Sequence, residues 1–172
     1  MYQPIVKLHG EERGLYQVLL RLSDEKGQLL DASKVIPVAK AAGIGEKLDR
    51  WIIKQALKSI VNQKVDPSSQ LFVCLSSVSL IDTSLVSFIE KALAASGLPK
   101  QCIVFQIEEA DAVNHLKRVI ALCAELKEKG YALCLSNFGA DPEQKVLVDQ
   151  LDVDYVKIAD SKADGIHQNP EI

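Results

Sequence analysis

Two polar side chains interrupt an apolar stretch near the start of the chain, LYQVLLRL at residues 15–22. In an extended strand, successive side chains point to opposite faces, so Gln17 and Arg21 would share one face with Leu15 and Leu19. A buried amide or guanidinium without partners is costly, so something polar is expected to meet this face. The guanidinium fork of Arg21 suits the paired oxygens of a phosphate or carboxylate. The stretch therefore predicts either a ligand site or a structural ion pair.

Polar residues also lie at the ends of four later apolar stretches, each of which is predicted to be a strand. Parallel strands bring their carboxyl ends to one edge of a sheet, and ligands bind at that edge in α/β folds. With Gln17 and Arg21, these residues would form a polar rim around one mouth. They are Cys74 and Ser76, Gln106 and Glu108, Ser136 and Asn137, and Lys157.

Several of these residues also have a simpler interpretation. Lys157 lies in DYVKI, and it either contributes a cation to the mouth or reaches water from an edge strand. Gln17 and Gln106 have the alternative of bonding to backbone groups inside a barrel. Glu108 and Glu109 suit an exposed strand-to-helix corner, where the helix dipole favours carboxylates.

The four cysteines are single, widely spaced and surrounded by apolar residues. They lack the pair spacing of zinc sites, so buried reduced thiols are expected. Three isolated histidines add no Cys–His or Ser–His pair along the sequence, and nothing there points to nucleophilic chemistry. The residues are Cys74, Cys102, Cys123 and Cys134, with His9, His115 and His167.

The elements that position these residues alternate between strand and helix in the second part of the chain. This order is typical of a parallel sheet, and the short strands are apolar enough to be covered on both faces. Strands are predicted at residues 71–75, 102–107, 131–135 and 155–158, and helices at 83–96, 112–129 and 142–151, the last capped by Asp141 and Pro142.

The first part of the chain is expected to add a strand pair and two helices. Residues 2–8 and 15–22 would pair across the turn GEERG, and a polar loop would follow. Asp31 is suited to cap a helix that ends at Ala41. A longer amphipathic helix is predicted at residues 46–63, with Trp51 on its apolar stripe.

These elements allow an open doubly wound sheet or a barrel of eight strands. An alternating barrel takes about 250 residues, whereas the 172 residues here hold five or six strands. The polar tail, residues 161–172, offers no credible further strand. We therefore expect one domain, with a barrel core at residues 1–160 and an exposed sheet edge.

Composition limits the classes of function. The chain is 48% hydrophobic and 25% charged, with a formal charge of −3, which is typical of a globular domain and argues against binding to duplex DNA or a membrane surface. No apolar run approaches the roughly 20 residues that span a bilayer, and the chain does not start with a secretion signal. A cytoplasmic location is the expectation.

The segment QPIVKLHGEERGLYQVLLRL, residues 3–22, resembles the start of EAL domains, which are bacterial cyclic di-GMP phosphodiesterases. Further segments resemble the family in the same order: VIPVAKAAGIGEKLDRWIIKQAL, FVCLSSVSL, FQIEEAD, LSNFGAD and LDVDYVKI. The resemblance covers almost the whole chain. It implies an α/β fold of the EAL type, a (β/α)8 TIM barrel with one antiparallel strand, truncated here after about six strands.

The resemblance also implies that the catalytic residues of the family have been lost. Family members hold divalent ions with carboxylates and an asparagine, and these positions carry Gln17, Cys74, Gln106, Ser136 and Asn137. Amides, a thiol and a hydroxyl lack the negative charge that hard cations require. We therefore expect no metal, no cofactor and no hydrolysis.

Other family positions are retained. Glu109 matches a family glutamate, Lys157 the strand lysine, Arg21 the arginine that faces a ligand phosphate, and Gln3 a glutamine near a guanine base. The expected ligand-binding residues are thus Gln3, Arg21 and Lys157. Two departures, Leu22 for a family tryptophan and GADPEQKVL for the loop after FG, put dimer packing in doubt.

The expected function is that of a degenerate, non-catalytic EAL domain that serves as a cyclic di-GMP receptor or regulatory module in bacterial signalling. The alternative is a scaffold that binds another protein without nucleotide, and an active phosphodiesterase is the least favoured reading. Expected partners are cyclic di-GMP and another signalling, pilus or biofilm protein, with a homodimer left open.

Overall fold

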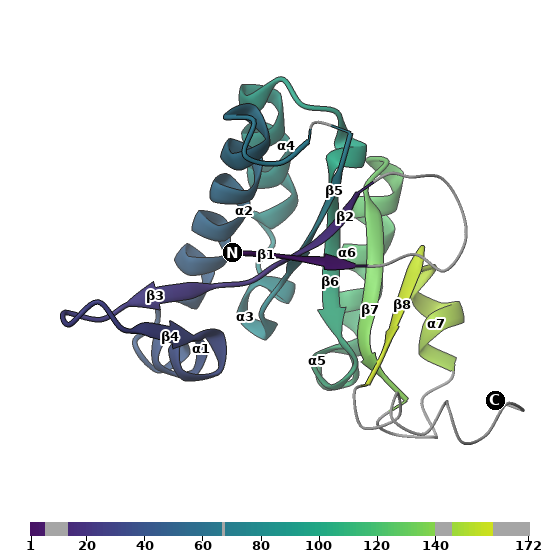
Figure 1. Ribbon diagram of the computed structural model, residues 1–172. Coiled ribbons are helices and arrows are strands. Elements are labelled where there is room, and N and C mark those ends of the chain that lie inside the picture. Colours follow the sequence, from purple (N-terminus) through teal and green to yellow (C-terminus); the bar gives the residue numbers. More distant parts are fainter. Residues whose placement is uncertain (6–13, 67, 140–145, 160–172) are drawn as a thin grey trace, which may run out of the picture.

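The computed structural model describes residues 1–5, 14–66, 68–139 and 146–159. Its main feature is a curved sheet of six strands in the order β1-β2-β5-β6-β7-β8, a half-barrel with helices packed on its outer face (Figure 1). The bounds are β1 Tyr2–Ile5, β2 Leu15–Val18, β5 Gln70–Cys74, β6 Ile103–Glu108, β7 Ala132–Phe138 and β8 Tyr155–Ile158.

The strand directions agree with the sequence-based predictions. Strand β1 is antiparallel to β2, with Gln3 opposite Gln17, and every later pairing in this sheet is parallel. The predicted α/β fold with one antiparallel strand is therefore confirmed. The turn GEERG, the cap at Asp141 and Pro142 and the tail 161–172 lie outside the described residues.

Three longer helices cover the outer face of the sheet: α2 Gly45–Val61, α4 Leu85–Ser96 and α6 Leu116–Glu128. Their apolar faces and the outward side chains of the strands form the main core, which includes Ile53, Ile60, Val73, Ile89 and Phe105. Shorter elements are α1 Ala32–Ala41, α3 Ser77–Leu80, the 3-10 helix η1 Lys100–Cys102, α5 Glu109–Asn114 and α7 Val146–Leu151.

One predicted strand is wrong, because residues 15–22 do not form a single strand. Leu19 N still donates to Met1 O at 2.9 Å, but the described pairings of β2 in the six-stranded sheet run only from Leu15 to Val18. The chain instead forms β3 Arg21–Ser23, which pairs with β4 Leu29–Asp31 in a separate two-stranded sheet. Gln17 and Arg21 therefore do not share a strand face.

Two helix predictions also need correction. In α2 the buried face carries Ile53, Ala56 and Ile60, and Trp51 is 47% exposed, because the helix offers two overlapping apolar stripes and only one faces the sheet. The helix predicted at 112–129 is two helices, α5 and α6. His115 between them has φ −129° and ψ 30°, which is outside the helical region.

Within the described ranges, no helix combines the length and apolar character needed to cross a bilayer.

Candidate ligand-binding site

The inner face of the half-barrel has two layers of side chains. Leu15, Phe72, Val104 and Cys134 form a small apolar cluster, against which Ile5 and Tyr155 pack. Because side chains alternate along a strand, residues two positions away point to the same face. Those nearer the carboxyl ends of β2 and β5–β8, with Gln3 of β1 opposite Gln17, form what we call the polar layer: Gln3, Gln17, Cys74, Gln106, Ser136 and Lys157.

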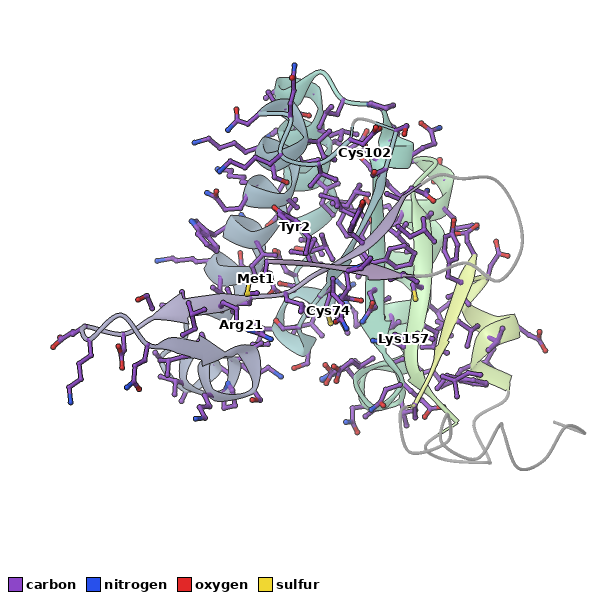
Figure 2. The ribbon with its side chains drawn as sticks, in the orientation of Figure 1. Met1, Tyr2, Arg21, Cys74, Cys102 and Lys157 are labelled. Atoms are coloured by element: carbon purple, nitrogen blue, oxygen red, sulfur yellow. The ribbon has the colours of Figure 1, made fainter. Side chains whose placement is uncertain are left out.

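A cleft of about 300 Å³ opens over this layer. Five of the six polar-layer residues line it, and Figure 2 shows two of them, Cys74 and Lys157, at the same end of the sheet. The predicted polar rim at the carboxyl ends of the strands is therefore present in part, because Arg21, Ser136 and Asn137 do not line the cleft. Helices α1, α2 and α5 complete the cleft wall. The further polar residues that line the cleft are Lys40, Asp49, Ser76, Glu108 and Asp111.

Gln17 and Gln106 are buried in the cleft floor, with 7% and 6% of their surface exposed. Neither Oε1 atom has a hydrogen-bond partner among the described residues, which costs about 1–3 kcal/mol for each buried amide oxygen. Gln17 Nε2 donates to Phe72 O at 3.4 Å, a long bond. The simpler interpretation was that both side chains bond to backbone groups. Among the described residues, Gln17 makes one such bond, which is weak, and the side chain of Gln106 makes none.

The thiol of Cys74 lies between the two glutamines, because β5 separates β2 from β6. Burial, followed by the negative charge of Glu108, raises the pKa of Cys74 to about 12. Burial likewise raises the pKa values of Cys102, Cys123 and Cys134 to about 11 or 12. All four cysteines are free thiols, as predicted, and Cys74 is a neutral side chain near neutral pH.

Two predicted residues of β7 lie outside the cleft lining. Ser136 is buried, and its Oγ donates to Ile107 O at 3.3 Å. Asn137 is exposed and has φ 58° at an irregularity in β7 between Leu135 and Phe138. Asn137 thus turns away from the layer to which Ser136 belongs.

Glu108 and Glu109 differ although they are adjacent. Glu108 is exposed, as expected for a strand-to-helix corner, and lines the cleft. Glu109 is 3% exposed, so the exposed corner is wrong for this residue. Its Oε1 accepts a hydrogen bond from Gly139 N at 3.2 Å, and the carboxylate therefore ties α5 to the end of β7.

Both interpretations of Lys157, a cation in the mouth and a side chain that reaches water from an edge strand, apply. It lines the cleft, and it is also exposed on β8, which ends the six-stranded sheet. Its neighbours Val156 and Ile158 are 43% and 47% exposed. Within the described residues β8 pairs with β7 alone, so the predicted exposed edge is observed there.

Arg21 does not line this cleft. It lies beside a smaller hollow of about 90 Å³ that is also lined by Tyr2 and Trp51. The two hollows share Val18, Leu19, Leu20 and Ile52, so they adjoin. Arg21 Nη1 donates to Leu20 O at 2.8 Å. Figure 2 shows Arg21 to the left of Cys74 and Lys157, close to β3.

The sequence reasoning missed Asp49, which is 4% exposed and lines the cleft. Its Oδ2 accepts hydrogen bonds from Ser76 N at 2.8 Å and from Ser76 Oγ at 2.7 Å. Lys40 Nζ donates to Ser77 Oγ at 2.7 Å nearby. These contacts hold the segment after β5 against α1 and α2. The sequence did contain a signal for Asp49, because this carboxylate lies four residues before Ile53, on the helix face that the core buries.

Among the described residues, no three His, Cys, Asp or Glu side chains are grouped closely enough to hold a metal ion. Asp49, Glu108 and Asp111 are the carboxylates that line the cleft.

Comparison with known proteins places these observations in a family. The EAL domain family matches residues 1–171. The EAL domain of FimX from Pseudomonas aeruginosa, solved bound to c-di-GMP, is 35% identical with a TM-score of 0.89, over 97% of this chain and 67% of that chain. The half-barrel therefore corresponds to part of an EAL-type TIM barrel.

Two curated relatives are longer proteins. The biofilm architecture maintenance protein MbaA of Vibrio cholerae is 30% identical over 141 residues, which are 81% of this chain and 18% of MbaA. The cyclic di-GMP phosphodiesterase PdeB of Shewanella oneidensis is 28% identical over 159 residues, 91% of this chain and 19% of PdeB. The chain thus spans about a fifth of the length of each.

Proposed function

Because the chain belongs to the EAL domain family of cyclic di-GMP phosphodiesterases, we propose that it is a catalytically inactive member that binds cyclic di-GMP as a receptor or regulatory module. One observation carries this proposal. The polar layer consists of neutral side chains and one cation, Lys157, where the family resemblance predicts metal-binding carboxylates and an asparagine.

The chemistry of these side chains argues against hydrolysis. Two-metal cleavage of a phosphodiester needs cations that activate water and bind the phosphate oxygens. Magnesium and manganese require anionic oxygen ligands to offset dehydration. The two buried amides, the thiol of Cys74 and the hydroxyl of Ser136 supply no such charge.

Binding of the nucleotide does not depend on these ions. Lys157 and Lys40 bring positive charge to the cleft, Gln3 lines it, and Arg21 lies in the adjoining hollow. Ligand pockets commonly have volumes of about 300–1,000 Å³, and the cleft, at about 300 Å³, lies at the lower end of this range. A cyclic dinucleotide is therefore expected to extend from the cleft into this hollow. We propose Gln3, Arg21 and Lys157 as its contacts, supported by the FimX relative solved with c-di-GMP.

Two measurements test the proposal. Isothermal titration with cyclic di-GMP in EDTA should show binding, and chromatography of cyclic di-GMP incubated with magnesium or manganese should show no product. Turnover of the nucleotide would contradict catalytic inactivity. Absence of heat at high micromolar nucleotide, in a folded sample, would contradict the receptor function.

The second candidate is a protein-binding scaffold that needs no nucleotide. It is favoured by exposed apolar side chains beside Arg21, since Tyr2 is 36% and Trp51 47% exposed. Arg21→Ala separates the two functions: nucleotide affinity should fall by more than about tenfold if Arg21 binds a phosphate. Arg118→Ala, an exposed arginine on α6 outside both hollows, is the matched control.

The wider setting of the domain is part of the same proposal. We propose that residues 1–172 form a single EAL-like domain, and they cover 67% of the FimX chain. We propose a cytoplasmic location and a further partner among signalling, pilus or biofilm proteins. Sedimentation of the chain with and without cyclic di-GMP would measure self-association.

A further inference from the structure

We propose that the side-chain amides of Gln17 and Gln106 donate their N–H groups directly to a phosphate of the bound nucleotide, in the place that metal ions would otherwise take. This inference rests on the proposed binding of cyclic di-GMP. It adds the groups that recognise the phosphate.

The first support is the state of the two amides. Both lie more than nine-tenths buried in the cleft floor, on β2 and β6, with Oε1 atoms that have no partner among the described residues. Gln17 makes one long bond, and no side-chain bond of Gln106 is found in the described ranges. Buried amides normally find partners, so two nearly unpartnered amides in the floor of a cleft point to contact with a ligand.

The second support is the match between the amides and a phosphate. A glutamine amide carries two donors at one end and an acceptor at the other, and the two ends are nearly equal in size. A half-turn about the last torsion of the side chain exchanges Oε1 and Nε2, and for Gln17 it gives up the long bond to Phe72 O. Phosphate oxygens only accept hydrogen bonds, and bonds to a charged acceptor are the stronger kind.

The third support is the charge around the two amides. Lys157 and Lys40 line the same cleft and would offset a bound anion. Asp49 faces it too, but its carboxylate already accepts two hydrogen bonds from Ser76. The remaining carboxylates, Glu108 and Asp111, belong to β6 and α5 and are not buried. A metal ion is the poorer occupant, because neutral amides compensate its dehydration poorly.

The test begins with titration of cyclic di-GMP in EDTA against the unaltered chain and against Gln17→Met and Gln106→Met. Methionine keeps the length of the side chain and removes the donors, so each variant should bind at least about tenfold more weakly. Gln101→Met, an exposed glutamine just before β6 and outside the cleft, is the matched control and should bind normally.

Gln17→Glu and Gln106→Glu provide a readout that a structural role would not change. In EDTA the added carboxylate should repel the phosphate, and magnesium should restore part of the affinity, whereas the unaltered chain should be indifferent to magnesium. The side-chain amide resonances of Gln17 and Gln106 in a nitrogen-15 spectrum should also shift on addition of cyclic di-GMP, and those of Gln101 should not.

The outcomes separate the two proposals. If the unaltered chain does not bind cyclic di-GMP, the receptor function fails and this inference fails with it. If the unaltered chain binds, but both methionine variants bind equally well and the amide resonances stay in place, the receptor function stands and the role of the two amides is overturned.

Discussion

The two faces of the sheet differ in how completely their side chains are satisfied. On the outer face, Phe105 is fully buried and its ring meets that of Tyr131 edge to face at 5.5 Å. On the inner face, the next residue of the same strand, Gln106, is nearly as buried but its Oε1 has no partner among the described residues. One strand therefore supplies both stability and a ligand site, on alternating residues.

The largest expected effect comes from breaking the outer face. Phe105→Ala removes a fully buried ring and leaves a cavity, so the free energy of unfolding should fall by about 3–5 kcal/mol. Urea unfolding followed by circular dichroism measures this loss. A loss below about 1 kcal/mol would mean that the outer face is not the main source of stability.

A smaller loss is expected where a helix of the outer face reaches the cleft. Asp49→Ala removes the acceptor of two partly buried bonds from Ser76 and should lower the free energy of unfolding by about 2 kcal/mol. The same unfolding assay applies. Asp24→Ala, which also removes an acceptor of two backbone bonds but in an exposed turn, should cost less.

Replacing an inner-face amide should have the opposite sign. Gln106→Met removes a buried amide oxygen that lacks a partner and keeps the side-chain volume, so the free energy of unfolding should rise by about 1 kcal/mol. Thermal unfolding without ligand detects the gain. If the variant is clearly less stable, Gln106 has a structural partner and the contrast between the two faces is weaker than described.

The smallest effect concerns pH. The pKa of Cys74 is raised to about 12, above its ordinary value of 9.0, so folding favours the neutral thiol. The associated stability is complete below pH 9 and is lost as the pH rises towards 12, because the unfolded chain ionises first. Cys74→Ala should therefore lose less stability than the unaltered chain between pH 7 and pH 10. Equal losses in urea titrations would contradict a buried neutral thiol.

The sequence predicted the parallel strands well because these strands are covered on both faces and read as short apolar runs. Strand β8 was predicted at the residues where it is found, and its neighbours to within about three residues at either end. The polar layer, apart from Gln3, followed from the same alternation, since each of these members lies in a strand whose phase the sequence displays.

The errors came from information that no local pattern contains. The break after Val18 depends on pairing with distant strands, because the chain leaves the six-stranded sheet there and forms the separate β3–β4 pair. The exposure of Trp51 depends on which side of α2 meets the sheet. Asp49 was missed because its partner, Ser76, is 27 residues further along the chain. Each case is decided by tertiary contacts rather than by propensity.

The bond between Asp49 and Ser76 has a consequence for the order in which the molecule assembles. It joins a helix that is anchored in the outer core to the segment that closes the cleft. The cleft wall therefore cannot take its final form before α2 has docked on the sheet. A partly folded chain would contain the strands but lack the complete binding site. The ligand would therefore bind only to fully folded molecules.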